Sequence, residues 1–208
     1  MAISSDMPAP TANPPPRTAT PSERHWGKDA FRIGFGVLWL IDAGFKWQPG
    51  FRKQYMDLLM SEGQGNATWM NWWFDFWKDL EHPYPGFFAY LAAVTETLIG
   101  IALILGFARK LTYIIGALFA FLIWATAEGF GGPYSAMSTD VGAAIIYCVV
   151  FLGLLALNYE AGPTRYSVDY YIEQRVSWWY RIAEVGRKRP APAAGTQTPA
   201  TDSPMRTD

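Results

Sequence analysis

The stretch GFFAYLAAVTETLIGIALILGFA, residues 86–108, decides the fold of this chain. Glu96 is its only acidic or basic residue, and almost every other side chain is apolar. Because a helix needs about 20 mainly apolar residues to cross the hydrocarbon core of a bilayer, the stretch predicts a transmembrane helix. A charge held in hydrocarbon costs at least ~2.5 kcal/mol, which makes Glu96 the first candidate for a functional residue.

Three further apolar segments, 31–47, 111–130 and 141–157, lie on either side of this stretch. The first and the last are close to the lower limit of roughly 17 residues for a span. All four segments contain glycines, and small residues let helices pack closely in lipid. We therefore expect an all-α fold, an integral membrane four-helix bundle over residues 30–158. A soluble helical bundle is the alternative, but it would need polar helix faces that the three segments after residue 85 almost lack.

Both ends of the chain are polar, which the whole-chain values of 50% hydrophobic residues and a net charge of -1 conceal. Residues 1–29 are rich in Pro, Ala, Ser and Thr and lack the apolar core of a signal peptide, so we expect a disordered cytoplasmic tail. Residues 190–208 have a similar composition, and we expect them to be disordered as well. Between these ends, residues 159–189 combine apolar and basic positions at helical spacing. This pattern predicts an amphipathic helix on the inner leaflet, with a partner-binding helix as the alternative.

The positions of Lys and Arg predict the orientation in the membrane, because cytoplasmic loops carry an excess of them. They occur in both end segments and at Arg109 and Lys110, whereas residues 131–140 contain none. In the longer loop, residues 48–85, acidic residues offset the basic ones. We expect a multi-pass protein of the cell membrane with both termini in the cytoplasm, and the lipid bilayer as its first partner.

The loop 48–85 is long for a connection between two spans, and its second half is crowded with tryptophans. Because Trp is enriched at membrane interfaces, the favoured interpretation is an interfacial helix that caps the bundle. A lid or a quinone-binding platform of stacked indoles is the other interpretation, since loops of this length are often functional. The quinone-site candidates are Trp69, Trp72, Trp73 and Trp77.

Five ionisable residues of the apolar segments and their ends fall near the outer end of the predicted bundle. They are Asp42, Lys46, Glu96, Glu128 and Asp140. Asp42 and Lys46 are four residues apart and can pair along one helix face. One lysine cannot neutralise four carboxylates, so the site would hold protons on its carboxyl groups, or recruit Arg52, Lys53 or a metal.

Most of these residues also have a structural interpretation. Asp140 can cap the helix that follows it, Glu128 can lie in headgroup water, and Lys46 can extend to the outer interface. Arg32 can extend to the inner interface in the same way. Glu96 is the hardest to explain structurally, because it lies far from both ends of its segment.

Motifs of common redox and nucleotide chemistry are absent from the sequence. Cys148 is the only cysteine, which excludes a CxxC motif and a disulfide within the chain. His25 and His82 are the only histidines, and neither lies in an apolar segment, so bis-histidine haem ligation within the chain is excluded. No haem, flavin, Fe–S or metal site is evident, and nothing in the sequence indicates nucleic-acid binding.

Four motifs of the chain resemble the DoxX/DoxD family. They are RIGFGVLWLIDAGFK at 32–46, ETLIGIALILGFAR at 96–109, STDVG at 138–142 and GPTRYSVD at 162–169. The resemblance covers roughly residues 30–170. It implies a four-helix membrane protein associated with redox chemistry.

The resemblance also implies a quinone-linked function, because DoxD is a subunit of thiosulfate:quinone oxidoreductase. Quinone would be the cofactor, and a periplasm-facing or membrane partner subunit would complete the enzyme. The implied substrate ligands are Lys46, Arg52, Lys53 and Asp140. The candidate catalytic groups, taken from the charged cluster described above, are Glu96, Asp42, Lys46 and Glu128. The alternative is a non-catalytic membrane protein that forms a proton or small-solute pathway, or that assembles with a membrane complex.

Overall fold

The computed structural model describes residues 26–61, 66–132, 134, 140–161 and 163–186, which form helices joined by turns. No strand occurs among them, so the prediction of an all-α fold is confirmed. The predicted tails 1–29 and 190–208 lie outside the described residues except for 26–29. Those residues form the first turn of α1 (Trp26–Lys46), where Asp29 pairs with Arg32. The prediction of disorder is therefore wrong for 26–29.

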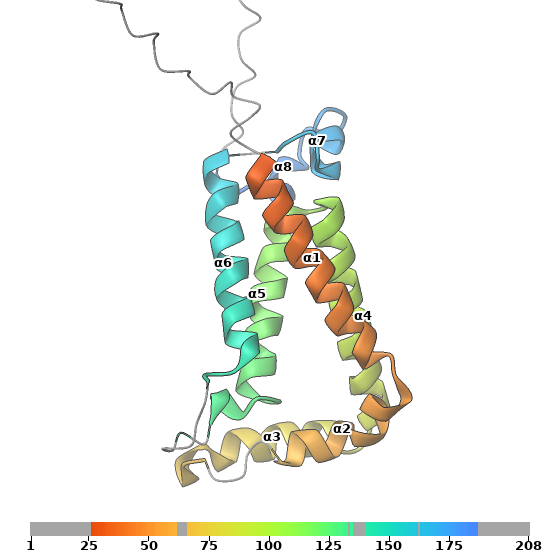
Figure 1. Cartoon of the computed structure of the whole chain (residues 1–208), viewed down its shortest axis with the longest axis vertical. Coiled ribbons are helices and arrows are strands. Elements are labelled where there is room, and N and C mark those ends of the chain that lie inside the picture. Colours follow the sequence, from red (N-terminus) through yellow and green to blue (C-terminus); the bar gives the residue numbers. More distant parts are fainter. Residues whose placement is uncertain (1–25, 62–65, 133, 135–139, 162, 187–208) are drawn as a thin grey trace, which may run out of the picture.

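Four long helices run along the longest axis of the molecule (Figure 1). They are α1, α4 (Pro85–Leu105), α5 (Arg109–Ala125) and α6 (Ala143–Ala161). α1 packs mainly on α4, and α5 packs mainly on α6. Each of the four predicted apolar segments coincides with one of these helices, apart from differences at the ends.

Glycines allow the close contacts within each pair of helices. The backbone of Gly100 on α4 lies against Leu40 of α1, and a Cβ at this position would come 2.6 Å from Leu40 Cδ2. Gly116 on α5 faces Phe151 of α6, and a Cβ here would overlap the phenyl ring. These close approaches are typical of helices that pack through small residues.

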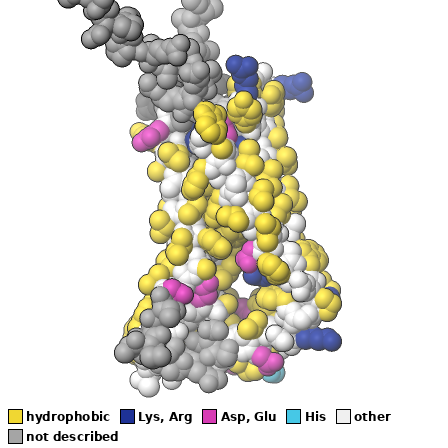
Figure 2. Space-filling model, viewed as in Figure 1, with side chains coloured by type: hydrophobic (Ala, Val, Ile, Leu, Met, Phe, Trp, Pro, Cys, Tyr) yellow, Lys and Arg dark blue, Asp and Glu magenta, His cyan; other side chains and the backbone are white. Residues whose placement is uncertain are grey.

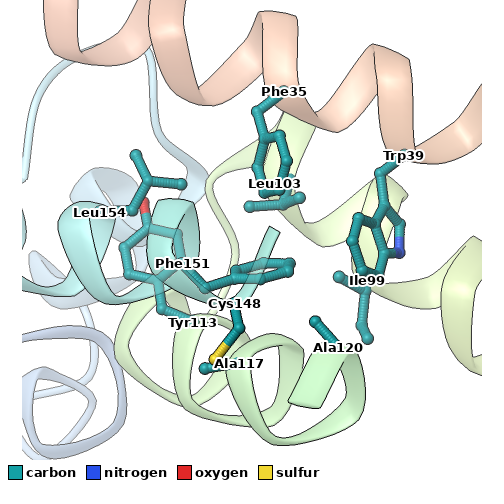
Figure 3. Close-up of a cluster of buried hydrophobic side chains, with 10 residues drawn as sticks. All are labelled: Phe35, Trp39, Ile99, Leu103, Tyr113, Ala117, Ala120, Cys148, Phe151 and Leu154. Carbon is teal, nitrogen blue, oxygen red and sulfur yellow. The ribbon is translucent and has the colours of Figure 1, made fainter. Parts of the chain in front are cut away.

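The centre of the bundle is an aromatic and aliphatic core, drawn in Figure 3. The ring centroid of Phe151 from α6 lies 5.0 Å from those of both Phe35 and Trp39 of α1. Leu103 of α4 and Ala120 of α5 are fully buried in the same core. All four long helices therefore contribute to one core.

Two of the four helices meet the requirements of a membrane span by length and composition, namely α4 and residues 143–160 of α6. α5 is shorter, with 17 residues, and α1 carries several charged residues. All four helices nevertheless expose large apolar side chains, and Figure 2 shows them along most of the height of one face. One example from each helix is Leu38, Leu98, Leu118 and Val149. Four spans stay a prediction.

Two shorter helices, α2 (Pro49–Ser61) and α3 (Asn71–Glu81), cross one end of the bundle (Figure 1). They occupy the predicted outer loop, and α3 is the helix expected in its second half. A short 3₁₀ helix, η1 (Thr68–Met70), leads into α3. The indole N–H of Trp73 on α3 donates to the backbone oxygen of Ala125 at 2.8 Å, which attaches α3 to the end of α5.

The C-terminal segment folds differently from the prediction of one amphipathic helix over 159–189. α6 continues to Ala161, and two short helices follow. They are α7 (Val168–Glu173) and α8 (Tyr180–Ala183). Pro163 breaks the helical pattern, because proline lacks the amide hydrogen that a helix needs. Asp169 and Glu184 are buried against the bundle instead of facing water.

Candidate functional site

A cavity of about 370 Å³ lies between α2 and α3 on one side and the ends of α4 and α5 on the other, with the end of α1 at its edge. Most of its wall is apolar or aromatic. The polar side chains that line it are Lys46, Tyr55, Glu81, Glu96, Thr126 and Glu128. Ligand sites commonly combine an apolar wall with a few polar groups in a volume of roughly 300 to 1,000 Å³. The cavity is therefore the candidate functional site.

Glu96 is the most deeply buried acid of the cavity, with an exposed fraction of 1%. Lys46 Nζ lies 3.3 Å from Glu96 Oε1 and 3.6 Å from Asp42 Oδ2. The close packing of α1 on α4 brings the lysine to Glu96. Among the described residues, neither carboxylate oxygen of Glu96 accepts a hydrogen bond of normal geometry. The Lys46 ammonium is therefore the charged partner that the structure gives to this buried carboxylate.

Tyr55 and Glu81 form a second polar pair on the cavity wall. The Tyr55 hydroxyl on α2 donates to Glu81 Oε2 on α3 at 2.6 Å. Burial raises the pKa of the Glu81 carboxyl, and burial together with the neighbouring carboxylate raises the pKa of Tyr55. Sequence reasoning missed both residues, because it treated 48–85 as a loop with one helix. The signal that could have found them is an acid and a tyrosine on two consecutive amphipathic helices.

Glu128 lines the cavity and also holds the start of α6. Its carboxylate accepts a hydrogen bond from the backbone N–H of Ala144 at 3.0 Å. Asp140, by contrast, is exposed and accepts a hydrogen bond from the backbone N–H of Gly142 at 2.9 Å. The turn before α6 therefore uses both acids, and only Glu128 reaches the cavity.

Two of the three basic residues expected to bind an anion, Arg52 and Lys53, are not part of the cavity wall. The Arg52 guanidinium donates to the Tyr90 hydroxyl and lies 4.8 Å from the centre of the Tyr90 ring. Lys53 is exposed. The wall of the cavity therefore combines three carboxyl groups with one ammonium group, that of Lys46.

Of the four candidate tryptophans, Trp73 contacts both Trp72 and Trp77 edge to face, and only Trp77 belongs to the cavity wall. Trp77 lines the cavity, and its buried indole N–H has no hydrogen-bond partner among the described residues. The indole N–H of Trp73 donates its hydrogen bond to Ala125 at the end of α5. Trp69 and Trp72 are 73% and 65% exposed, as expected for side chains at a membrane interface.

The opposite end of the bundle contains a second buried polar cluster, centred on Arg32. The alternative interpretation, in which Arg32 extends to the inner interface, does not hold, because the exposed fraction of Arg32 is 1%. Its guanidinium donates to the backbone oxygens of Leu103, Ile104 and Tyr166, the latter two at 3.0 and 2.8 Å. It also pairs with Asp29 at 3.3 Å. Backbone carbonyls in the last turn of α4 retain acceptor capacity, which the buried guanidinium uses.

Arg109 forms the other half of this cluster. It pairs with Asp169 at 3.1 Å and with Glu184, and all three are buried. Asp169 Oδ1 also accepts the backbone N–H of Ala108 at 2.7 Å and the indole N–H of Trp179 at 2.8 Å. Buried charges that are paired and hydrogen-bonded in this way hold a fold together. We assign the cluster a structural role, the attachment of the C-terminal segment to the bundle.

The two polar clusters thus differ in their chemistry. The Arg32 and Arg109 cluster joins the C-terminal segment to the bundle, whereas the cavity contains the Lys46–Glu96 ion pair and Trp77, whose indole N–H has no hydrogen-bond partner among the described residues. Among the residues that the structure describes, no three His, Cys, Asp or Glu side chains lie close enough to hold a metal ion. The cavity offers hydrogen-bond donors and acceptors to a ligand with an apolar body.

Comparison with known proteins gives one family match. Residues 27–129 match the family model described as DoxX. The matched region runs from α1 to the turn after α5 and includes Lys46, Glu96 and Glu128. No curated protein and no solved structure matches the chain.

Proposed function

The chain belongs to the DoxX family of membrane proteins, and from this premise we propose that it is the quinone-binding subunit of a membrane redox system. The quinone site of the proposal is the cavity between α2, α3, α4 and α5. The finer family assignment, to DoxD-like subunits of thiosulfate:quinone oxidoreductase, is part of the same proposal.

The observation that carries the proposal is a mainly apolar cavity with one buried ion pair and an unpaired indole N–H. A quinone is an uncharged ring with two carbonyl oxygens, so it needs an apolar wall and hydrogen-bond donors. Two residues that line the cavity carry such donors, Lys46 with its ammonium group and Trp77 with its indole N–H, and the proposal assigns these donors to the quinone. A hydrogen bond from a charged donor contributes about 1.5 to 3 kcal/mol, enough to orient a small ring.

The position of the cavity also supports a ligand from the bilayer. Leu91 on α4 lines the cavity and is 46% exposed. Leu58 on α2 lines it too and is 42% exposed. A quinone with a hydrocarbon tail can therefore have its ring in the cavity and its tail against these leucines and the surrounding lipid.

The proposal includes a topology with four spans and both termini in the cytoplasm. Apolar side chains exposed on all four long helices support the spans. The excess of Lys and Arg in the end segments and at Arg109 and Lys110 supports the orientation. The cavity with α2 and α3 then faces the outer side of the cell membrane.

Reduction of a quinone to a quinol consumes two electrons and two protons. In the proposal, Lys46 and Glu96 orient one carbonyl and hold a proton beside it. A reduced sulfur compound bound to a partner subunit supplies the electrons, for example two thiosulfate ions that become one tetrathionate. We place the thiosulfate outside the cavity, because its mainly apolar wall offers a dianion one cation, Lys46, which Glu96 already pairs.

The packing of the bundle supports a binding site over a pathway across the membrane. The core of Phe35, Trp39 and Phe151 lies between the cavity and the Arg32 cluster. A water-filled route would have to pass through this close-packed region, whose rings are in direct contact.

The test begins with gentle purification and extraction of bound quinone. Binding of a short-chain quinone is then titrated for the wild type, Lys46→Met and Glu96→Gln. We expect quinone in the extract and an affinity about tenfold lower in Lys46→Met, since one hydrogen bond of about 1.4 kcal/mol is lost. Lys53→Gln is the matched control, because Lys53 is exposed and outside the cavity. Absence of bound quinone together with unchanged titrations for both cavity variants would overturn the proposal.

A further inference from the structure

The cavity holds two separate polar pairs on different helices. Lys46 and Glu96 belong to α1 and α4, and Tyr55 and Glu81 belong to α2 and α3. All four residues line the same cavity. A quinone has two carbonyl oxygens, and each takes up one proton on reduction, so the proposed reaction needs two proton-donating groups. The quinone proposal assigns the first pair and leaves the second without a role.

Glu81 is placed between the cavity and water. It is the last residue of α3, and its exposed fraction is 6%. The next residues along the chain, His82, Pro83 and Tyr84, are all exposed. A carboxyl group in this position can exchange a proton with water on one side and with the Tyr55 hydroxyl on the other, across the 2.6 Å hydrogen bond.

We propose that Tyr55 and Glu81 form the proton-exchange pair for the second carbonyl of the quinone, connecting the cavity to water on the side of α2 and α3. This inference rests on the proposed quinone site. In the reduction, Glu81 is protonated and donates its O–H to the Tyr55 oxygen, the reverse of the bond in the structure, so that the Tyr55 hydroxyl gives its own proton to the quinone oxygen and takes that of Glu81. Glu81 then takes a proton from water. The electrons come from the reduced sulfur donor named above, so atoms and charge balance.

The environment of the pair suits this role. Burial raises the pKa of Glu81, which keeps the carboxyl protonated over a wider pH range than a free glutamate. The pKa of Tyr55 is raised as well, so the tyrosine passes a proton on and does not persist as an anion. The other titratable groups on the cavity wall are Lys46 from α1, Glu96 from α4 and Glu128 after α5. The charges of these three residues act on both polar pairs, so the test leaves all three residues unsubstituted.

A structural pair that only joins α2 to α3 is the competing explanation. It predicts lower stability when the hydrogen bond is removed, but no change in how the reaction depends on pH. The test therefore has to measure a pH profile in a folded protein, and it has to separate the loss of quinone binding from the loss of proton delivery.

The experiment uses the full chain in detergent, loaded with a short-chain quinone and reduced by dithionite. The rate of quinol formation is followed by ultraviolet absorbance across a range of pH. We expect the wild-type rate to fall as pH rises through the pKa of Glu81, because the protonated carboxyl is depleted. Glu81→Gln and Tyr55→Phe should each lower the rate about 100-fold and remove this pH dependence, as expected when a general acid is lost.

Asp79→Asn is the matched control, since Asp79 is an exposed acid on the same helix. Helical circular dichroism and quinone affinity close to the wild type show that a variant is folded and loaded. If the wild type binds no quinone, the proposed function fails and this inference fails with it. If quinone binds and the folded Tyr55→Phe and Glu81→Gln proteins keep the wild-type rate and pH profile, only the proton-exchange pair is wrong.

Discussion

The carboxylate of Asp169 accepts hydrogen bonds from both the backbone nitrogen and the Nε of Arg109, at 2.9 and 3.1 Å. The two residues are 60 positions apart in the chain. Asp169 thereby satisfies free N–H groups at the start of α5, where a negative charge is favoured by the helix dipole. The same contacts attach the C-terminal segment to the turn between α4 and α5.

Asp169→Ala should destabilise the protein by about 3 kcal/mol, because it leaves Arg109 buried with one partner fewer. The measurement is unfolding in detergent micelles, followed by circular dichroism. Asp79→Ala removes an exposed acid and should change stability by less than about 0.5 kcal/mol. A similar small change for both variants would contradict the structural role of the Arg109 cluster.

Gly106→Ala should be destabilising for two reasons. Gly106 ends α4 with φ 64°, a conformation that costs an alanine energy, and a Cβ here would come 2.8 Å from Arg32 Nη1. We expect a loss of more than about 1 kcal/mol in the same unfolding assay. Gly153→Ala is the control, since a Cβ there meets nothing within 4 Å and α6 is helical. The stability of Gly153→Ala should equal or exceed that of the wild type. If both variants lose stability, the loss in Gly106→Ala is not specific to the conformation and contacts of Gly106.

Lys46→Met should destabilise the protein by about 3 kcal/mol, because Glu96 then lies buried without its cation. The double variant Lys46→Met/Glu96→Gln should recover most of this loss, since neither charge remains. A double-mutant cycle in detergent should yield a coupling energy of about 1 to 3 kcal/mol. Additive effects of the two changes would mean that the 3.3 Å ion pair contributes nothing to the fold.

Glu81→Gln should change how stability depends on pH. The folded-state pKa of Glu81 lies above its unfolded value, so the folded protein binds more protons between the two pKa values. The contribution of Glu81 to stability is therefore fully present below the unfolded pKa and is lost as pH rises through the folded pKa. The stability of the wild type relative to Glu81→Gln should fall over this window. The comparison uses thermal unfolding at several pH values, and a constant difference would show that the Glu81 pKa is unshifted.

Trp73→Phe should loosen α3 without unfolding the bundle. The substitution removes the indole donor to the Ala125 carbonyl at 2.8 Å and leaves that oxygen with one partner fewer, at a cost of about 1 to 2 kcal/mol. Hydrogen exchange read by mass spectrometry should show faster exchange in α3 and unchanged exchange in α4. Trp69→Phe, at a residue that is 73% exposed, should leave both helices as they are.

The four long helices could be predicted from the sequence with little loss, whereas α2, α7 and α8 could not. Apolar runs such as 86–108 and 141–157 identify α4 and α6, because the tendency to form an apolar helix depends on residues close together in the chain. The pairing of Asp42 with Lys46 was predictable for the same reason, since positions four apart on a helix are neighbours. The deep position of Glu96 follows from its distance to both ends of its segment.

The candidate site could be predicted only in part. Glu96, Lys46 and Glu128 were identified and do line one cavity. Arg52, Lys53 and Asp140 were expected at the same place but lie outside the wall. The positions of these side chains depend on how α2 and the turn before α6 pack against the bundle. No pattern of neighbouring residues in the sequence predicts this packing. Tyr55 and Glu81 escaped notice because their significance depends on the crossing of two short helices.

Sequence alone determined that this chain has apolar helices, a buried acid and a basic pattern that suits a membrane protein, since each of these depends on local composition. Only the tertiary structure decided which partner each charge has. The packing of α1 on α4 joined Lys46 to Glu96, and the folding back of the C-terminal segment joined Asp169 to Arg109. A buried charge is stable only beside a complementary group, and residues far apart in the chain supply that group through packing.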